Sequence, residues 1–340
     1  MLKRLPDSIA ICVAAGAFFL FSSCTSPSST VDTPTAPTCD DPHTIQSLPV
    51  TLGEEGATYC LGDGVAGATG EITIAADNVT LYGGGTVEIK SKITVPCKTW
   101  SSTCADGYLG AVIQDVRTSG GIEFWLGGNH KVLGECDALE ECTCKVGGIT
   151  LWGSSDNLIS GCRFETSESS QVRISNEVGG AAKNNTFEKS LFLGDNVPDT
   201  HFIWLSRDEG TIFQDNLVRV RGIPGGGGMM PSFGSNGNII RRNTFSMEWV
   251  TPAYAASQSI SNMFTLRDGT KNLTFEENRV YGNGCIFIFH AGSEGPTGPP
   301  QEGNVFRHNL IYQLPVIQDD GQEITAPAFW VHTDPLPFDV

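Results

Sequence analysis

One short pattern of polar and apolar positions returns along the chain from residue 77 onward. Each copy has a polar or Gly residue, a short apolar stretch, a corner residue that is most often Asn, and a second apolar stretch. The six clearest copies lie at residues 157–164, 185–192, 211–218, 238–245, 272–280 and 304–311. With the corner positions 162, 190, 216, 243, 278 and 309 aligned, successive copies are 28, 26, 27, 35 and 31 residues apart. A repeat of this length predicts a solenoid.

The content of each copy predicts strands rather than helices. The apolar stretches are short and alternate with polar residues, Gly or Asn stands at their ends, and no helical period is sustained past residue 38. An Asn at a fixed corner tolerates the left-handed backbone region, and its amide can hydrogen-bond the next copy. We therefore expect Asn216, Asn243, Asn278 and Asn309 to stack in register at one corner. Two or three β-sandwich domains are the alternative all-β interpretation, but they would not place an Asn repeatedly at one corner.

The repeat resembles that of right-handed parallel β-helix proteins in the pectate-lyase-like superfamily, over residues 45–335. The resemblance implies an all-β fold, a single-stranded right-handed parallel β-helix, in which a solenoid of three-strand coils occupies residues 39–340. It also implies a polysaccharide ligand, bound in a groove on the face of the first strands, and a polysaccharide lyase or glycoside hydrolase as the enzyme class. The paired-aspartate and Gly-His-Gly pattern of polygalacturonase-like hydrolases and the Trp-Asp-His stretch of pectate lyases are absent. The sequence therefore leaves open whether the chain is an enzyme.

The first strand of each coil must precede the repeated phrase. The candidates are residues 121–126, 148–152, 171–175, 202–206, 229–233, 263–267, 286–290 and 329–332. Alternation places one set of side chains inside: Val172, Ile174, Ile203, Leu205, Phe264, Leu266, Phe287, Phe289, Phe329 and Val331. In the second and third strands, the expected interior residues are Ile159, Phe187, Phe213, Ile240, Leu273 and Val305. We expect long insertions between a third strand and the next first strand, as groove walls, at residues 97–120, 222–228, 249–261 and 291–302.

The outward residues of the first strands form the candidate functional site. The candidate substrate-binding residues are Trp125, Trp152, Arg173, Trp204 and Trp330, because aromatic planes pack on the apolar faces of sugars and Arg pairs with carboxylates or sulfates. The candidate catalytic residues are His290, His332 and Arg267, since His titrates near neutral pH. Glu123 and Asp268 are weaker candidates for a partner acid. The alternative interpretation is that large aromatics simply cover the flank of a sheet, in a non-catalytic adhesive or structural envelope protein.

Residues 1–23 have the features of a bacterial lipoprotein signal peptide. Lys3 and Arg4 precede an apolar core at residues 9–21, which is shorter than the roughly 20 apolar residues that span a bilayer. The core ends at Phe21-Ser22-Ser23-Cys24, which resembles the lipobox in which a cysteine becomes the lipidated first residue. The alternative is ordinary secretion, with Cys24 entering a disulfide.

A tether follows the expected lipidation site. Residues 24–38 comprise Cys24 and a segment rich in Ser, Thr and Pro that has nothing to pack. Thr25 rather than Asp follows Cys24, which in the lipoprotein resemblance points to the outer membrane. We therefore expect an exported protein held at the cell outer membrane or cell surface through lipid on Cys24.

The cysteines agree with an oxidising compartment. Without Cys12 and Cys24, nine remain, so at least one is left over from intramolecular pairing. Short separations suggest pairs Cys39–Cys60 and Cys97–Cys104, with Cys136 joined to Cys142 or Cys144. A zinc site at Cys136, Cys142 and Cys144 is the competing interpretation, but no Cys-x-x-Cys pair supports it.

Charge limits the choice of partners. The 340 residues carry 21 basic and 38 acidic side chains, a formal charge of −17. Nucleic-acid binders present basic stripes, so a nucleic-acid partner is not expected. No cofactor or metal site can be identified in the sequence, and Ca²⁺ remains an option without an assigned set of ligands.

Overall fold

The computed structural model describes residues 43–332 except for short gaps. The gaps are residues 100–105, 138–139, 167–171, 176–181, 198–200, 223–226, 233, 250–261, 268, 283–284, 291–300, 318–322 and 325–328. The predicted signal peptide, Cys24, the tether and Asp268 lie outside the described residues.

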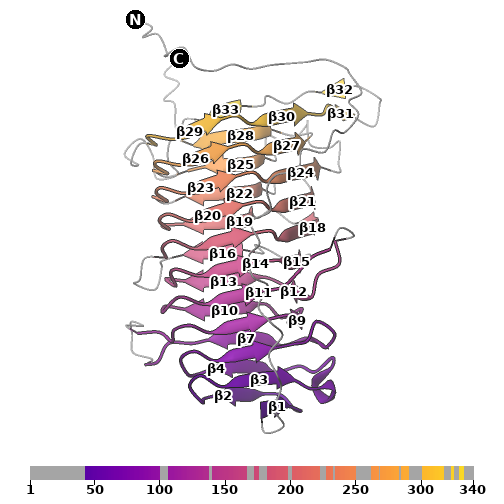
Figure 1. Cartoon of the computed structure of the whole chain (residues 1–340). Coiled ribbons are helices and arrows are strands. Elements are labelled where there is room, and N and C mark those ends of the chain that lie inside the picture. The colour runs from indigo at the N-terminus through magenta and orange to yellow at the C-terminus, as the bar shows by residue number, and fades with distance from the viewer. Residues whose placement is uncertain are drawn as a thin grey trace, which may run out of the picture. The chain divides into compact units, whose positions relative to one another are not determined.

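Successive strands of the chain belong to three different parallel sheets, so three strands and their turns make one coil (Figure 1). Sheet B holds β2 (Val50–Leu52), β4 (Glu71–Ile74), β7 (Lys92–Val95), β10 (Ile122–Trp125), β13 (Ile149–Trp152), β16 (Val172–Ser175), β19 (His201–Ser206), β22 (Gly227–Ser232), β25 (Asn262–Leu266), β28 (Cys285–His290) and β33 (Phe329–His332). Sheet A holds β1 (Thr44–Ile45), β3 (Thr58–Leu61), β5 (Thr80–Tyr82), β8 (Val112–Gln114), β11 (Lys131–Leu133), β14 (Leu158–Ser160), β17 (Thr186–Glu188), β20 (Ile212–Gln214), β23 (Ile239–Arg241), β26 (Thr274–Glu276) and β29 (Val305–Arg307).

Sheet C forms the third side of the coils from β6 to β30, and the coils of β1 to β4 have no strand in it. It holds β6 (Glu88–Ile89), β9 (Arg117–Thr118), β12 (Cys144–Val146), β15 (Cys162–Thr166), β18 (Leu191–Val197), β21 (Leu217–Gly222), β24 (Thr244–Trp249), β27 (Arg279–Gly282) and β30 (Leu310–Gln313). A short 3-10 turn, η2 (Asp63–Val65), and an antiparallel pair, β31 (Val316–Ile317) and β32 (Glu323–Ile324), complete the described elements. The predicted parallel β-helix of three-strand coils is confirmed, and all eight predicted first strands lie in sheet B.

The middle residues of the sheet A strands form one row through the core. In register they are Ile159, Phe187, Phe213, Ile240, Phe275 and Phe306. The expected interior position was wrong for Val305, which is 43% exposed. Because strand side chains alternate between faces, the one-residue step from Val305 to Phe306 moves the side chain from solvent to core. Leu273 is buried but lies just before β26, outside this row.

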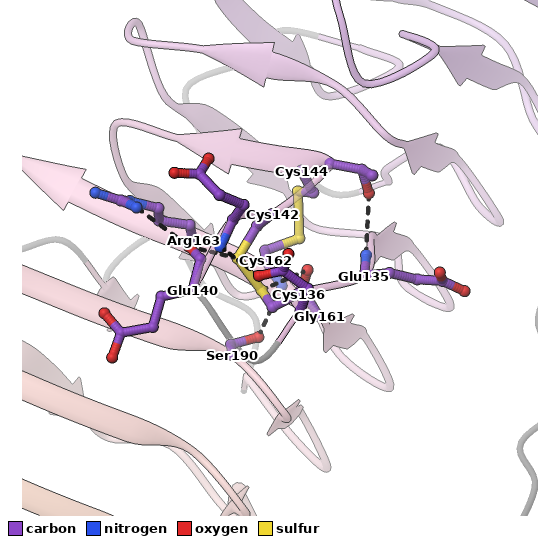
Figure 2. Close-up of a disulfide and its surroundings, with 12 residues drawn as sticks. Glu135, Cys136, Glu140, Cys142, Cys144, Gly161, Cys162, Arg163 and Ser190 are labelled. Carbon is purple, nitrogen blue, oxygen red and sulfur yellow. Dashed lines mark hydrogen bonds between the residues drawn. A yellow bond between two sulfur atoms is a disulfide. The ribbon is translucent and has the colours of Figure 1, made fainter.

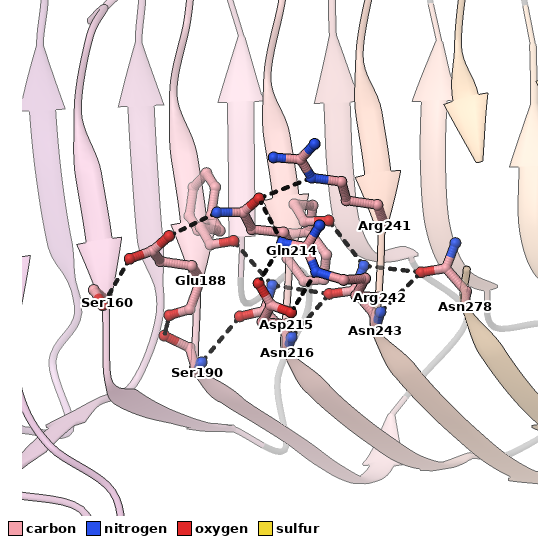
Figure 3. Close-up of polar contacts among 12 residues, drawn as sticks. Ser160, Glu188, Ser190, Gln214, Asp215, Asn216, Arg241, Arg242, Asn243 and Asn278 are labelled. Carbon is pink, nitrogen blue, oxygen red and sulfur yellow. Dashed lines mark hydrogen bonds and ion pairs between the residues drawn. The ribbon is translucent and has the colours of Figure 1, made fainter. Parts of the chain in front are cut away.

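The predicted Asn ladder is present at the corner between sheets A and C (Figure 3). The Oδ1 atoms of Asn243, Asn278 and Asn309 accept the backbone N–H of the ladder residue one coil earlier, each at 2.9 Å. Ser190 stands at the same place: its N–H donates to Asn216, and its hydroxyl accepts from the N–H of Cys162. The ladder therefore links adjacent coils, as the aligned corner positions predict, through side chains that are buried except for the partly buried Asn309.

The left-handed residue at this corner is the one before the ladder Asn, which corrects the expectation that the Asn adopts that backbone region. Asp215, Arg242, Glu277 and His308 have φ values of 56°, 55°, 56° and 54°. The left-handed residue turns the chain on the outside of the coil. The following Asn then points inward, where its amide can reach the coil below.

A second ladder lies at the corner between sheets B and A. Asn157, Asn238 and Asn304 accept the N–H groups of His130, Thr211 and Leu273 respectively. His130 continues this ladder in place of an Asn, since its Nδ1 accepts the N–H of Ala111 at 3.1 Å. The sheet A strands from β14 to β29 therefore have a ladder residue at each end.

Two of the four expected insertions lie elsewhere. Residues 222–228 and 249–261 fall between a sheet C strand and the next sheet B strand, as predicted, although Gly222, residues 227–228 and Trp249 belong to β21, β22 and β24 themselves. Residues 97–120 instead follow β7 of sheet B and contain β8 and β9, while residues 291–302 separate β28 of sheet B from β29 of sheet A. The expected insertions therefore connect to sheet B strands at both strand ends: some precede a sheet B strand and others follow one.

Two disulfides brace the middle coils (Figure 2). Cys136 pairs with Cys142, one of the two predicted partners, and Cys144 pairs with Cys162 across adjacent strands of sheet C. The latter pair was not predicted, because only the coil register reveals that these cysteines are neighbours. Cys60 and Cys97 are also disulfide-bonded, and their predicted partners, Cys39 and Cys104, lie outside the described residues.

The Cys136–Cys142 loop extends over sheet C. Glu140 at its tip receives two hydrogen bonds from Arg219 of β21, at 2.8 and 3.0 Å, and its carbonyl accepts one from Arg163 of β15. Glu140 and Arg219 are 79 residues apart in sequence. The loop thereby joins coils that do not touch through their own strands.

Candidate functional site

The outer face of sheet B carries the candidate site. The expected inward residues on its described strands are buried: Val172, Ile174, Ile203, Leu205, Phe264, Leu266 and Phe287. The intervening Trp125, Trp152, Arg173, Trp204 and Arg267 are partly exposed. Strand alternation therefore placed these five residues on the outer face correctly.

Four of these residues form a continuous stack across β10, β13, β16 and β19, called here the Trp–Arg column. Trp125 and Trp152 occupy paired positions, with ring centroids 5.5 Å apart and planes inclined by 31°. The Cζ atom of Arg173 lies 4.6 Å from the Trp152 ring and 4.7 Å from the Trp204 ring. The guanidinium is held between two indoles, the arrangement in which a cation is attracted to the ring faces.

The order of the strands decides which ring faces remain open. Because β13 lies between β10 and β16, Trp152 has Trp125 on one side and Arg173 on the other. Both faces of Trp152 are therefore covered by protein, and a sugar can reach only its edge. The side of Trp204 that faces Arg173 is covered in the same way.

A charged pair lies at the β10 end of the column. Lys92 Nζ is 2.7 Å from Glu123 Oε2, and Trp125 Nε1 donates to the same oxygen at 3.1 Å. Glu123 thus fixes the orientation of the Trp125 indole and presents a carboxylate beside it. Such a group can accept hydrogen bonds from the hydroxyls of a ligand.

The candidate catalytic residues occupy one register row near the opposite end of sheet B. His290 on β28 pairs with His332 on β33, and Arg267 follows Leu266, which pairs with Phe289. Trp330 pairs with Ile288. Only the backbone of β33 and of His290 is described, so their side-chain roles stay predictions. Three strand steps separate β19 from β28, about 14 Å at the usual strand spacing.

The sequence could place the column residues on one face but could not bring Arg173 between the two indoles. Arg173 is paired in register with Thr150, not Trp152, and its guanidinium reaches the ring diagonally. The residue types gave no signal for this contact. It depends on the length of the Arg side chain and on the offset between neighbouring strands.

A buried carboxyl group lies at the turn after β19 rather than on this face. Asp208, fully buried at the turn after β19, accepts hydrogen bonds from Ser235 and Asn238, and burial raises the pKa of its carboxyl group.

Among the described residues, no group of three or more His, Cys, Asp or Glu side chains could hold a metal ion. Within the same residues, no helix is long and apolar enough to cross a membrane.

Comparisons with known proteins address the fold. No curated protein sequence matches the chain. Solved structures of DFA-IIIase from Arthrobacter chlorophenolicus A6 are similar, among them a cysteine-to-alanine mutant bound to DFA-III (11% identity, TM-score 0.35) and a complex with GF2 (12% identity, TM-score 0.35). These matches cover 78% and 77% of this chain but 65% and 64% of the DFA-IIIase chains, slightly under two thirds. The family model described as "Right handed beta helix region" matches residues 144–316, just over half of the chain, which therefore belongs to the right-handed β-helix family.

Proposed function

We propose that this chain is an exported lipoprotein, anchored through Cys24, that binds an extracellular polysaccharide along the outer face of sheet B. The observation that carries the proposal is the Trp–Arg column. Three tryptophans and an arginine on four successive coils form an ordered, partly exposed ridge on an otherwise strongly acidic protein. Large exposed apolar patches mark interaction sites and ligand-binding grooves.

The geometry favours a ligand that lies alongside the ridge. The indole edges of the column contact the apolar C–H groups of sugar rings. Glu123 and Lys92 exchange hydrogen bonds with hydroxyls at the β10 end. Because Arg173 and Glu123 already hold the rings in place, the side chains lose little conformational freedom on binding.

The column also assigns different roles to its members. Trp152 is enclosed on both faces and supports its neighbours, whereas Trp204 contacts one other member of the column, Arg173. We expect Trp204→Ala to weaken polysaccharide binding at least about tenfold while changing stability little, since roughly 1.4 kcal/mol of lost contact gives that factor. Trp152→Ala is expected to lower stability by about 2–4 kcal/mol, because it leaves a cavity in the stack.

Affinity electrophoresis of the purified chain through gels containing acidic or neutral polysaccharides measures binding, and thermal denaturation measures stability. Tyr312→Ala, on the outer face of sheet C, is the matched control for loss of an exposed aromatic. Binding that survives Trp204→Ala at full strength would contradict a site on this face. Absence of retardation by every polysaccharide would favour the alternative, a structural envelope protein whose column only covers the sheet.

Cleavage of the bound polysaccharide is the finer part of the proposal. The backbones of His290 and His332 are paired in register, and Arg267 follows Leu266, the partner of Phe289, so the register supports a cluster of these three candidates for proton transfer and charge stabilisation. Unsaturated product ends and new reducing ends, followed together, distinguish a lyase from a hydrolase. If His290→Ala and His332→Ala bind as the wild type and no product forms with any chain, the protein is a binder.

A further inference from the structure

We propose that Asp208 is a buried, uncharged carboxylic acid that holds the end of β19, and with it Trp204, in place for as long as it keeps its proton. Asp208 follows Trp204 at the corner where the chain leaves sheet B, and it is 1% exposed. Because Trp204 belongs to the Trp–Arg column, this role rests on the proposed function. A buried carboxyl group is stable in its charged form only where cations or hydrogen-bond donors replace the lost water.

Neighbouring coils fill the same place with small, uncharged residues. Bridges between residues 183, 209, 236 and 271 align the residues that precede them. These are Ala182, Asp208, Ser235 and Thr270, which are 0%, 1%, 0% and 1% exposed. Of the four, only Asp208 can ionise. Since the coils on either side close without an acid at this corner, packing alone does not explain the carboxyl group.

The charged side chains around this corner lie at the surface. Arg207 and Glu209, on either side of Asp208, are exposed, and Glu209 pairs with Lys183 of the preceding coil at 2.7 Å. The corresponding residue of the next coil, Asn236, is uncharged. Among the described residues, the side chains that hydrogen-bond the Asp208 carboxyl group are uncharged, and burial raises its pKa.

The hydrogen bonds at Oδ1 of Asp208 also favour a protonated acid. This oxygen lies 2.5 Å from Ser235 Oγ and 3.1 Å from the amide nitrogen of Asn238. The same Ser235 hydroxyl is 3.0 Å from the carbonyl oxygen of Leu205, which can only accept. A hydroxyl has one proton and cannot donate to both oxygens at once. The bond between Ser235 and Asp208 can be donated from either side, so a proton on the acid lets both contacts form together.

The second carboxyl oxygen has no donor to stabilise a charge. Oδ2 of Asp208 is buried and makes no hydrogen bond in the described part of the chain, and neither does the hydroxyl of Thr211. A negative charge there would stay unsolvated until the corner opened to water. Ionisation and opening are therefore coupled. The opening acts on the Leu205 carbonyl, next to Trp204, and so loosens the contact of Trp204 with Arg173.

The coupling fixes the direction of the pH effect. The carboxyl group of an unfolded Asp has a pKa of about 3.9, and that of folded Asp208 is higher. The retained proton contributes stability that is complete below about pH 4 and is lost as the pH rises toward the pKa of the folded carboxyl group. Over that range, the unfolding equilibrium constant rises about tenfold per pH unit relative to a chain without this acid.

Urea denaturation at pH 5, 6 and 7 tests the charge state. Asp208→Asn removes the ionisation and keeps the shape of the side chain, and Asp208→Ser copies Ser235 of the next coil in case the amide does not fit. For both variants, the ratio of the wild-type unfolding constant to that of the variant should rise about tenfold per pH unit. Glu209→Gln, at the adjacent exposed acid, is the matched control, and its ratio should stay constant within about twofold.

Fluorescence of Trp204 tests the link to the column. The difference between the spectra of chains with and without Trp204→Phe reports the surroundings of this indole. Between pH 5 and 9, the difference spectrum should shift to longer wavelength in the wild type, because water reaches the indole, and stay constant in the Asp208→Asn chain. Neither measurement needs a polysaccharide, so both remain decisive if the proposed function fails.

Three results would overturn the proposal. One is a ratio of unfolding constants that does not change with pH for either variant, since Asp208 would then be charged in the folded chain. Another is a ratio that changes equally for Glu209→Gln, because the slope would then not come from Asp208. The third is a Trp204 spectrum with the same pH dependence in the wild type and in Asp208→Asn, which would show that the acid does not hold the end of β19.

Discussion

His130 is a histidine in a position built for asparagine. It is fully buried, stacks on Phe124 with ring centroids 4.5 Å apart, and accepts the N–H of Ala111 through Nδ1. A nitrogen that accepts a hydrogen bond must be unprotonated. Burial in this apolar environment lowers the pKa of the imidazole from 6.5 to about 4. The folded protein therefore keeps His130 neutral at pH values where the unfolded chain protonates it.

The consequence for stability has a definite sign. The lowered pKa contributes stability that is complete above about pH 6.5 and is lost as the pH falls through about 4. We expect His130→Asn, which restores the usual ladder residue, to reduce the loss of unfolding free energy between pH 7.5 and 4 by about 2–3 kcal/mol. Urea denaturation of the wild type and the variant at both pH values measures this loss.

Exposed His308 supplies the control for this experiment. His308 has a φ of 54°, a conformation that Asn tolerates well, so His308→Asn changes a histidine outside the core without straining the backbone. Its acid sensitivity should equal that of the wild type. An equal acid sensitivity of His130→Asn and the wild type would show that His130 is not the group responsible.

At the scale of the strand and its turns, the Asn ladder is the main polar link between coils. The amide of Asn243 accepts the N–H of Asn216 through Oδ1 and donates from Nδ2 to the carbonyl of Phe213 at 2.8 Å. Both backbone groups belong to the preceding coil and are buried. Loss of the amide leaves a donor and an acceptor without partners, and each such group costs about 1–3 kcal/mol.

Substitution of Asn243 is therefore expected to show a graded effect. Asn243→Ala should lower the unfolding free energy by about 2–4 kcal/mol, and Asn243→Ser should lower it by less. Ser190 shows why, since its hydroxyl accepts the N–H of Cys162 at 3.2 Å in the same ladder. Chemical denaturation of the wild type and the two variants gives the order of their unfolding free energies. An Ala variant as stable as the wild type would mean that water replaces the amide.

The same elements show what could be predicted from sequence. The coil order was predictable because the phrase repeats, and the faces of sheet B were predictable because strand side chains alternate with a period of two. The wrong interior position of Val305 shows the limit of the method, since a one-residue error in alignment inverts a strand. The Asn corner was located correctly, but its left-handed residue was placed one position too late.

Contacts between coils were not predictable, because they depend on insertion lengths. Cys144 and Cys162 are neighbours only because 18 residues complete one coil at that point, whereas other coils take up to 35 residues. The Glu140–Arg219 pair likewise needs a contact across β15 and β18, the two sheet C strands between β12 and β21. For the candidate site, sequence identified the residues of the Trp–Arg column but not the enclosed faces of Trp152.

At the scale of the whole molecule, each coil contacts mainly its neighbours, as in other solenoids. A weak coil can therefore open without the rest. The disulfide between β12 and β15 and the contact of Glu140 with β21 tie together the coils that carry Trp125, Trp152, Arg173 and Trp204. Since these coils also hold the Trp–Arg column, the bracing keeps the proposed binding ridge ordered.

Anchoring through Cys24 remains a prediction at this scale, and it determines where the ridge would work. In the expected host, a diderm bacterium, wild-type chain should be recovered in the membrane fraction and should incorporate labelled fatty acid. Cys24→Ala should abolish both, because the thiol is the site of lipid attachment and stable anchoring needs more than one lipid chain. Globomycin, which blocks lipoprotein signal cleavage, should make the precursor of the wild type accumulate but leave the variant unaffected.

Cys12→Ala removes the cysteine inside the predicted signal segment and should change neither membrane recovery nor labelling. Recovery of unlipidated wild-type chain in the soluble fraction would instead support ordinary secretion.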